Sequence, residues 1–268
     1  MSQPGFGDAR NTVISELATF NGFLYAGTIN PADGYQIWKT KAERKPPYEW
    51  AKVVTSGACR GNLNEAVISF CVFRGALYVG SGISMGGHDR KNNVGPAAAE
   101  LIRIHPDDTW DLISGTPRLT AQGNKWPLSS MGPGFDNPFC GYLWRMEKHG
   151  GYLYVGTFDS SVFMPYADLS KRPGVKVLEF IGIEKTLGKR GGAELWRSAD
   201  GASWEPMTDN GFGNPYNYGI RNIISTPGCL FVGTANPFGP QVALETMSGS
   251  WVYAENPRGG LEVWMAQI

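Results

Sequence analysis

The chain has 268 residues, with 24 basic and 24 acidic side chains and therefore no formal net charge at pH 7. This balance excludes the strongly positive field by which many proteins bind nucleic acid or an anionic membrane surface, and no apolar run is long enough to span a bilayer. Glycine (36 residues) and proline (18) are frequent beside 9 tryptophans and 11 tyrosines. Such a composition is typical of many short strands joined by tight turns.

The start of the chain lacks the basic segment followed by an apolar one that marks a secretory signal. Its four cysteines occur singly, without the spacing of a metal site. We therefore expect a cytoplasmic protein with reduced thiols. His105 and His149 have no second ligand at short spacing, so we expect no zinc site. No cofactor-binding motif is present, and the sequence leaves open only a structural calcium ion.

In chain order, one short phrase returns four times. It consists of leucine, an aromatic residue, a small or β-branched apolar residue, glycine and a hydroxyl residue, and each copy follows a turn signal such as Asn21-Gly22. The copies are Leu24–Thr28, Leu77–Ser81, Leu153–Thr157 and Leu230–Thr234. A repeat of this kind is typical of an all-β array whose units pack on one another.

Alternation of apolar and polar residues predicts four strands in each unit, with the phrase as the second. The first strand is expected at Thr12–Phe20, Ala66–Phe73, Tyr142–His149 and Asn222–Thr226. The third strand is expected at Gln36–Lys39, Glu100–Arg103, Glu194–Arg197 and Glu262–Trp264. A fourth strand that opens on tryptophan is expected at Trp50–Val53, Trp110–Ile113 and Trp204–Met207.

Four-stranded units repeated in sequence favour a β-propeller. We expect a single domain over 1–268, with blades at approximately 8–57, 58–117, 134–210 and 211–268. The phrase glycines are separated by 53, 76 and 77 residues. The extra length falls between the second and third strands, at 82–98, 158–192 and 235–260, and segment 176–183 fits a short helix or an extra hairpin equally well.

The fourth unit ends at Trp264–Ile268, before any fourth strand. Three explanations remain open: a three-stranded blade, a blade that a partner chain completes, and the C-terminal portion of a larger ring. Because an open strand edge favours pairing, we expect self-association or a partner chain at this blade.

In a propeller, the loops before the first strand and after the second open on one face around the channel. Alignment of the units on the phrase glycine gives polar columns that we expect at this mouth. Sixteen residues before the glycine stand Asn11, Asn64, Cys140 and Asn217. Eleven residues before it stand Glu16, Ser69, Arg145 and Asn222. Three residues after it stand Asn30, Ile83, Asp159 and Asn236.

The columns suggest a small ligand, anionic or phenolic, because arginine forks suit such groups. The candidate binding residues are Arg221, Tyr218, Tyr142, Asn236, Asn30 and, in a polar insert, His88. The candidate catalytic residues are Asp159, Glu65 and Arg145. Either of the two carboxylates would act as a general base if burial raises its pKa. In the alternative interpretation, the asparagines bond their own turns and pairs such as Glu16 with Arg145 tie blades together.

The blocks Tyr142–Met146, Leu153–Asp159, Gly211–Gly219 and Gly233–Pro240 resemble a family of bacterial propeller proteins, over nearly the whole chain. The repeat is also similar to the propeller domain of cyanobacterial enzymes that alkylate resorcinols or carboxylates with secondary alkyl chlorides in cylindrocyclophane and bartoloside assembly. Those enzymes add a calcium-binding N-terminal domain and more blades.

This second resemblance implies an alkyl-transfer enzyme of natural-product biosynthesis. In such an enzyme Asp159 or Glu65 would deprotonate the nucleophile, and an arginine would hold the departing chloride. The alternative function is a non-enzymatic interaction scaffold that self-association or a partner chain completes.

Overall fold

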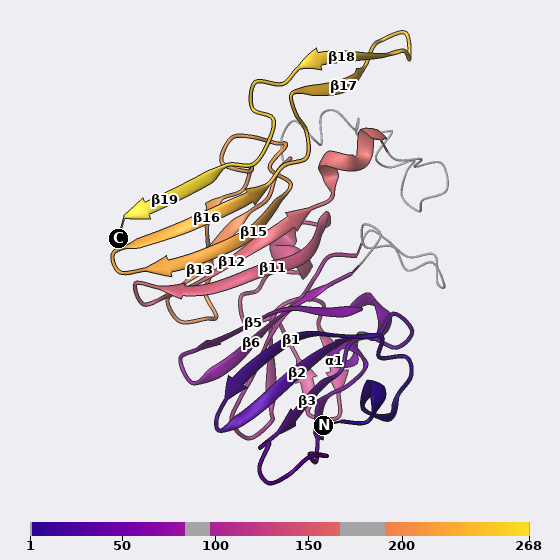
Figure 1. Ribbon diagram of the computed structural model, residues 1–268, viewed down its shortest axis with the longest axis vertical. Coiled ribbons are helices and arrows are strands. Elements are labelled where there is room, and N and C mark those ends of the chain that lie inside the picture. The colour runs from indigo at the N-terminus through magenta and orange to yellow at the C-terminus, as the bar shows by residue number, and fades with distance from the viewer. Residues whose placement is uncertain (1, 84–96, 167–190, 268) are drawn as a thin grey trace.

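A computed structural model describes residues 2–83, 97–166 and 191–267 of the chain (Figure 1). Strands β1 to β19 make up most of the regular structure in these ranges, and short helical turns make up the rest. The predicted all-β class is therefore confirmed. No helix within the described ranges is long and apolar enough to cross a membrane.

The strands form four successive antiparallel units. Unit 1 contains β1 (Val13–Phe20), β2 (Phe23–Ile29), β3 (Ile37–Thr40) and β4 (Ala51–Val54). Unit 2 contains β5 (Ala66–Phe73), β6 (Ala76–Gly82), β7 (Leu101–Ile104) and β8 (Trp110–Ser114). Unit 3 contains β11 (Cys140–His149), β12 (Tyr152–Asp159), β13 (Leu195–Ser198) and β14 (Glu205–Thr208). Unit 4 contains β15 (Gly219–Thr226), β16 (Cys229–Ala235) and β19 (Val263–Gln267).

One residue pair joins each unit to the next, where the second strand of one unit meets the first strand of the following unit. The pairs are Ile29 with Ala66, Gly82 with Tyr142, and Phe158 with Gly219. Units 1 and 4 lie at opposite ends of the long axis (Figure 1). In the described part of the chain they do not pair with each other, so the sheet is not closed.

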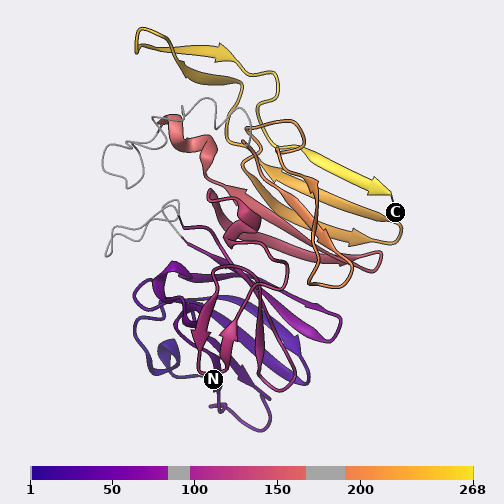
Figure 2. The same cartoon turned by 180° about the vertical axis from the view of Figure 1, so that it is seen from behind.

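Two hairpins stand outside the units. The first, β9 (Arg118–Thr120) with β10 (Gly123–Lys125), was not anticipated from the sequence. The second, β17 (Gln241–Glu245) with β18 (Trp251–Glu255), lies in the insert of unit 4 and projects from one end of the molecule (Figure 2). Segment 176–183 lies outside the described residues.

A left-handed turn precedes the first strand of every unit. Its two central residues have φ between +54° and +67°, where a glycine at the first position avoids steric strain. The pairs are Gly5-Phe6, Gly57-Ala58, Gly134-Phe135 and Gly211-Phe212. The short helical segments are η1 (Pro4–Gly7), α1 (Ser56–Cys59), η2 (Gly61–Leu63), η3 (Pro133–Asp136) and η4 (Ser161–Tyr166).

The first strand of each unit also contains a β-bulge, always at the same column. The register shifts between Ile14 and Glu16, Val67 and Ser69, Leu143 and Arg145, and Ile220 and Asn222. A bulge inserts one residue and re-aims the side chains around it. This is why a polar column can follow an apolar one within a single strand.

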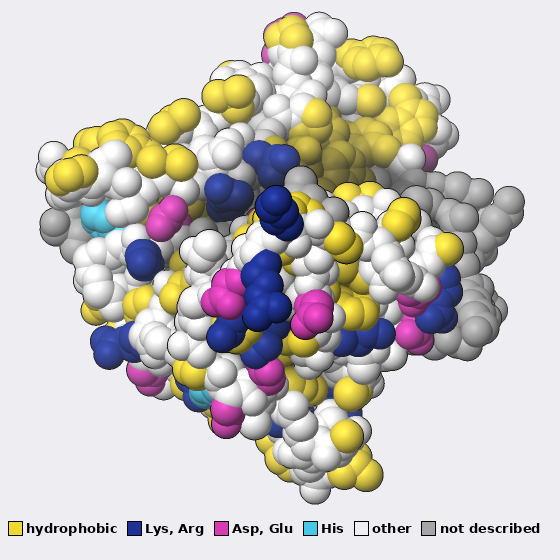
Figure 3. All heavy atoms as spheres, turned by 60° about the horizontal axis from the view of Figure 1, so that its bottom comes forward, with side chains coloured by type: hydrophobic (Ala, Val, Ile, Leu, Met, Phe, Trp, Pro, Cys, Tyr) yellow, Lys and Arg dark blue, Asp and Glu magenta, His cyan; other side chains and the backbone are white. Residues whose placement is uncertain are grey.

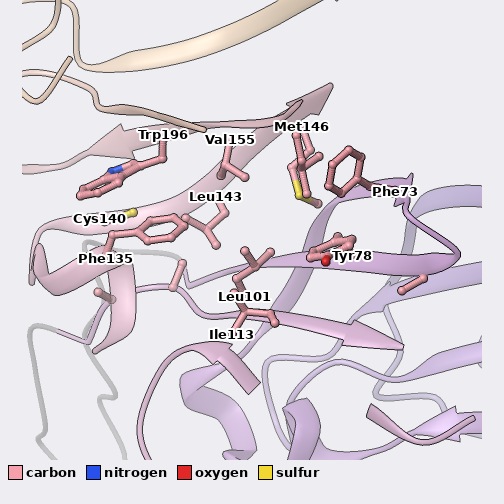
Figure 4. Close-up of a cluster of buried hydrophobic side chains, with 14 residues drawn as sticks. Phe73, Tyr78, Leu101, Ile113, Phe135, Cys140, Leu143, Met146, Val155 and Trp196 are labelled. Atoms are coloured by element: carbon pink, nitrogen blue, oxygen red, sulfur yellow. The ribbon is translucent and has the colours of Figure 1, made fainter. Parts of the chain in front are cut away.

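The hydrophobic core lies between the units, as three clusters. In the cluster between units 2 and 3, Tyr78 and Leu101 pack on Leu143 and Met146 (Figure 4). We call the side of a unit that packs on the following unit its forward face, and the side that packs on the preceding unit its rear face. Similar clusters join units 1 and 2 and units 3 and 4.

Three of the phrase glycines lie in close contact with the following unit. A Cβ at Gly27 would lie 2.6 Å from Cβ of Val67 in unit 2, and a Cβ at Gly156 would lie 2.6 Å from Cβ of Ile220 in unit 4. Real Cβ atoms do not approach this closely. The glycine is therefore required so that the next unit can pack directly on the strand.

Candidate functional site

The asparagine column holds the units together internally. Nδ2 of Asn11, Asn64 and Asn217 donates to the carbonyl of the left-handed turn, at 2.9 Å in each case. The same Nδ2 atoms donate to Gln36, Glu100 and Glu262, just before the third strand, at 2.7–2.9 Å. The asparagines thus satisfy their own turn and strand, as the alternative interpretation holds.

Two of the candidate binding residues belong to the same networks. Asn30 is fully buried, and its Nδ2 donates to Asn11 Oδ1 at 2.9 Å. Asn236 Nδ2 donates to Asn217 Oδ1 at 3.2 Å. The structure therefore places Asn30 and Asn236 in the hydrogen-bond networks of units 1 and 4 respectively.

Unit 3 has a buried carboxyl pair in this network. Cys140 occupies the asparagine column, and Asn137 supplies the amide: its Nδ2 lies 2.9 Å from Glu194 Oε1 and 3.4 Å from Asp159 Oδ2. In unit 2 the equivalent Glu100 forms ion pairs with two arginines. Among the described residues no cation pairs with Asp159 or Glu194.

Burial dominates the electrostatics of this pair. It raises the pKa of Asp159 to about 6, although hydrogen bonds from Ser161 and Asn137 oppose the shift. It also raises the pKa of Glu194 to about 7, with a contribution from the Asp159 charge. Asp159 is 0% exposed, so its carboxylate does not reach solvent.

Replacement of Asp159 by asparagine, the residue of units 1 and 4 at this position, is expected to stabilise the protein at pH 8. The folded pKa of Asp159 lies above its usual value of 3.8, so the folded state binds an extra proton between about pH 4 and 6, and stability falls as pH rises through that range. Removal of the charge should raise the free energy of unfolding at pH 8 by on the order of 2 kcal/mol.

Urea denaturation at pH 4, 6 and 8 measures this difference. The reciprocal control is Asn30→Asp, which introduces a carboxyl group at the matching position of unit 1 and should destabilise most at pH 8. A gain for Asp159→Asn that does not grow with pH would contradict the assignment.

A cluster of half-buried aromatic side chains lies where units 3 and 4 meet. Ring centroids of Tyr142 and Phe158 are 4.8 Å apart, those of Phe158 and Tyr218 are 5.3 Å apart, and those of Phe163 and Tyr218 are 5.0 Å apart. We define the aromatic cluster as Tyr142, Trp144, Phe158, Phe163 and Tyr218. Each ring offers a flat apolar surface, and each tyrosine adds a polar hydroxyl group.

Glycines on neighbouring strands make room for these rings. A Cβ at Gly219 would overlap the ring of Trp144, and a Cβ at Gly82 would overlap the ring of Tyr142. The two rings thus lie close against the backbone of neighbouring strands. The alternation Tyr142-Leu143-Trp144 explains the placement: Leu143 enters the core, and its neighbours point to the opposite side.

The aromatic contacts continue toward hairpin β17–β18. Phe163 contacts Phe238 at 5.8 Å, Phe238 contacts Tyr166 at 5.6 Å, and Tyr166 stacks on Trp251 at 5.7 Å between ring centroids. Tyr166 also donates its hydroxyl to the carbonyl of Ala243 at 2.9 Å. The hairpin is therefore anchored to the outer end of the aromatic cluster.

An arginine of unit 4 lies over the aromatic cluster, in electrostatic reach of a charged group of unit 1. The guanidinium of Arg221 lies 5.0 Å from the Trp144 ring centroid, a cation–π arrangement. Burial raises the pKa of Glu16, while the charges of Arg145 and Arg221 oppose that rise, so all three side chains are within electrostatic reach. On the face in Figure 3, Lys and Arg side chains are interspersed with Asp and Glu.

Glu65 lies near the phenol groups. Burial raises the pKa of Tyr142, and the charges of Glu65 and Tyr218 raise it further. The structure thus brings Tyr142, Tyr218 and Arg221 to the ring of Trp144. Arg145 and Arg221 are in electrostatic reach of Glu16, and Glu65 is in electrostatic reach of Tyr142. His88 lies outside the described residues. The column alignment did not find Trp144, Phe158 or Phe163, although their apolar alternation beside Tyr142 and Tyr218 could have revealed them.

Among the described residues, no three His, Cys, Asp or Glu side chains gather as a metal site. All four cysteines are free thiols.

No protein-family model matches the chain, and no curated protein matches it. Among solved structures, it is similar to PhoX of Pseudomonas fluorescens, at 14% identity and a TM-score of 0.47, over 94% of this chain and 52% of that one. It is also similar to a sucrose-6-phosphate hydrolase of Lactobacillus gasseri (10%, TM-score 0.37, 80% and 38% covered). A third similar structure is the GH32 β-fructofuranosidase BmSUC1 of Bombyx mori, at 13% identity and a TM-score of 0.39, over 85% of this chain and 44% of that one. The chain thus spans about half the length of these chains, or less.

Proposed function

We propose that the four units are successive blades of a β-propeller and that the chain binds a small anionic molecule with an aromatic part. The observation that carries this proposal is Arg221 above Trp144, with Arg145 nearby and the aromatic cluster beside them. A ligand ring would stack on the cluster, and its acidic group would lie between the two guanidinium groups.

The charges of the two arginines favour an anion. Neither Arg145 nor Arg221 forms an ion pair with a residue of the described ranges. Glu16 is the carboxylate in reach of both, so the three groups together leave one positive charge. Because Arg145 is half-buried, its charge attracts a carboxylate or phenolate more strongly than it would in water.

The finer proposal is alkyl transfer to the bound phenol or carboxylate. Since Asp159 is fully buried, the base would be Glu65. Glu65 would take the phenol proton, the phenolate oxygen would form the new C–O bond, and chloride would leave with the electrons of the broken C–Cl bond. Chloride release from a secondary alkyl chloride and resorcinol tests this step, which Glu65→Gln should abolish. Release that persists in Glu65→Gln would contradict it.

Binding is tested with naphthalene-2-carboxylate as the probe, by quenching of tryptophan fluorescence. The neutral naphthalene-2-carboxamide serves as the comparison ligand. We expect the acid to bind at least about tenfold more tightly than the amide, because a charge-assisted hydrogen bond contributes about 1.5–3 kcal/mol. Arg221→Met, which keeps an apolar stem, should remove that preference.

The matched control is Arg74→Met. Arg74 is also exposed and lies over an aromatic ring, that of Phe73 at 5.5 Å, which belongs to the cluster between units 2 and 3. This variant should bind the acid as the wild-type chain does. Equal affinity for acid and amide in the wild-type chain, or an unchanged preference in Arg221→Met, would overturn the proposed function.

A further inference from the structure

The forward face of unit 4 is uncovered. In units 1, 2 and 3, the first residue of the third strand is Ile37, Leu101 or Leu195, and each is at most 4% exposed because the next unit packs on it. The equivalent residue of unit 4 is Val263, which is 68% exposed. Leu261, two residues earlier, is also exposed, although its equivalents Tyr35, Ala99 and Ala193 are buried.

The rear face of unit 1 is uncovered in the same way. Val67, Leu143 and Ile220, thirteen residues before the phrase glycine, are fully buried against the preceding unit. Their equivalent in unit 1, Ile14, is 49% exposed. Three positions further along, Met146 and Ile223 are buried while Leu17 is 57% exposed.

The phrase glycines show the same difference. A Cβ at Gly27, Gly80 or Gly156 would collide with a residue of the next unit. At Gly233 the nearest atom to such a Cβ is Cβ of Asn222, in the same unit and at 3.5 Å, an ordinary contact. Gly233 thus retains the space that the other three glycines give to the next unit, and in the described structure nothing fills it.

We propose that a second copy of this chain covers these faces, with unit 4 of one copy packed on unit 1 of the other. Three contacts within the chain show what covers a forward face: the rear face of another unit. This chain exposes one of each, and their residues are apolar at the equivalent positions. In the contact between copies, Ile14 packs on Gly233 as Val67 packs on Gly27.

The two faces are different surfaces, so the contact is heterologous and continues head to tail until it closes or is capped. Hydrophobic side chains gather at the upper left of Figure 3, toward the end of the molecule where β19 lies. Contiguous apolar surface of this kind on a protein marks an interaction site.

Light scattering of the purified chain tests the proposal. The wild-type chain should have a mass of at least twice the 29.2 kDa of one copy. Leu17→Asp changes only the rear face, Val263→Asp changes only the forward face, and Gly233→Val fills the space for Ile14; each should give the mass of one copy. Leu119→Asp, at a position 77% exposed in hairpin β9–β10 and on neither face, should leave the assembly unchanged.

A mixture of Leu17→Asp and Val263→Asp distinguishes head-to-tail contact from other geometries. Each mixed pair can form one intact contact, between the unmodified unit 4 of the first variant and the unmodified unit 1 of the second. The mixture should therefore regain at least a two-copy mass. A single-copy mass for the wild-type chain, or an assembly that Leu17→Asp leaves intact, would overturn the proposal. Melting curves from circular dichroism establish that each variant is folded.

Discussion

Leu143→Ala should lower the free energy of unfolding by about 2–5 kcal/mol, the range for a buried leucine whose loss leaves a cavity. Leu143 is fully buried in the cluster between units 2 and 3 (Figure 4). Its backbone carbonyl accepts a hydrogen bond from Ser69 Oγ at 2.7 Å, and the substitution leaves that bond in place. The loss is therefore one of side-chain packing alone, and urea denaturation followed by circular dichroism measures it.

The matched control is Ile14→Ala, at the same column of unit 1. Ile14 is half exposed in the single chain, so its truncation should cost less than about 1 kcal/mol. Both variants are compared in the Gly233→Val background, so that contact between copies does not contribute. Similar losses at Leu143 and Ile14 would contradict the division of the core into clusters between units.

The second large effect is expected for Gly156→Val, which should lower the free energy of unfolding by at least about 3 kcal/mol or prevent folding. A Cβ at Gly156 would lie 2.6 Å from Cβ of Ile220, and both atoms are attached to strand backbone. Because neither strand can move without disturbing its pairing, the overlap produces the strain typical of an overpacked core. The midpoint of urea denaturation, or the yield of folded protein, reports the result.

Gly233→Val is the matched control for this second prediction. It places the same side chain at the same column, where the nearest contact is an ordinary one within unit 4. Its free energy of unfolding should stay within about 1 kcal/mol of that of the single wild-type chain. If both valine variants were equally unstable, the cost would come from the strand backbone rather than from contact between units.

The contact between units 3 and 4 at Gly156 also supports the candidate site. Phe158 lies two residues further along β12 and pairs with Gly219 of unit 4, and Tyr218 contacts the ring of Phe158. A variant that separates units 3 and 4 should therefore weaken binding of naphthalene-2-carboxylate as well as stability. In contrast, Arg221→Met should weaken binding and leave stability unchanged, since Arg221 is exposed.

The β-bulges in the first strands explain where Arg145 and Arg221 lie in their units. Period-two alternation places Arg145 beside the bulge of β11, and the equivalent bulge in β15 lies at Arg221. Glu16 of unit 1 lies in electrostatic reach of Arg145 of unit 3 and Arg221 of unit 4, and a shared site for these residues stays a prediction. Asn30, Asn236 and Asp159 form hydrogen bonds within their own units, as the alternative interpretation of the asparagines expected, although the sequence did not identify partners such as Asn137, because these are set by turn geometry.

The amino-acid sequence by itself determined the strands of the four units, their pairing within each unit and the repeated turns, because alternation and turn chemistry act over a few residues. β5 spans Ala66–Phe73, as the pattern predicted, while β15 begins at Gly219, three residues before its predicted start at Asn222. The tertiary structure alone decided which equivalent positions are buried. Leu101 and Val263 occupy the same place in their units, yet only Leu101 has a neighbouring unit to exclude water from it.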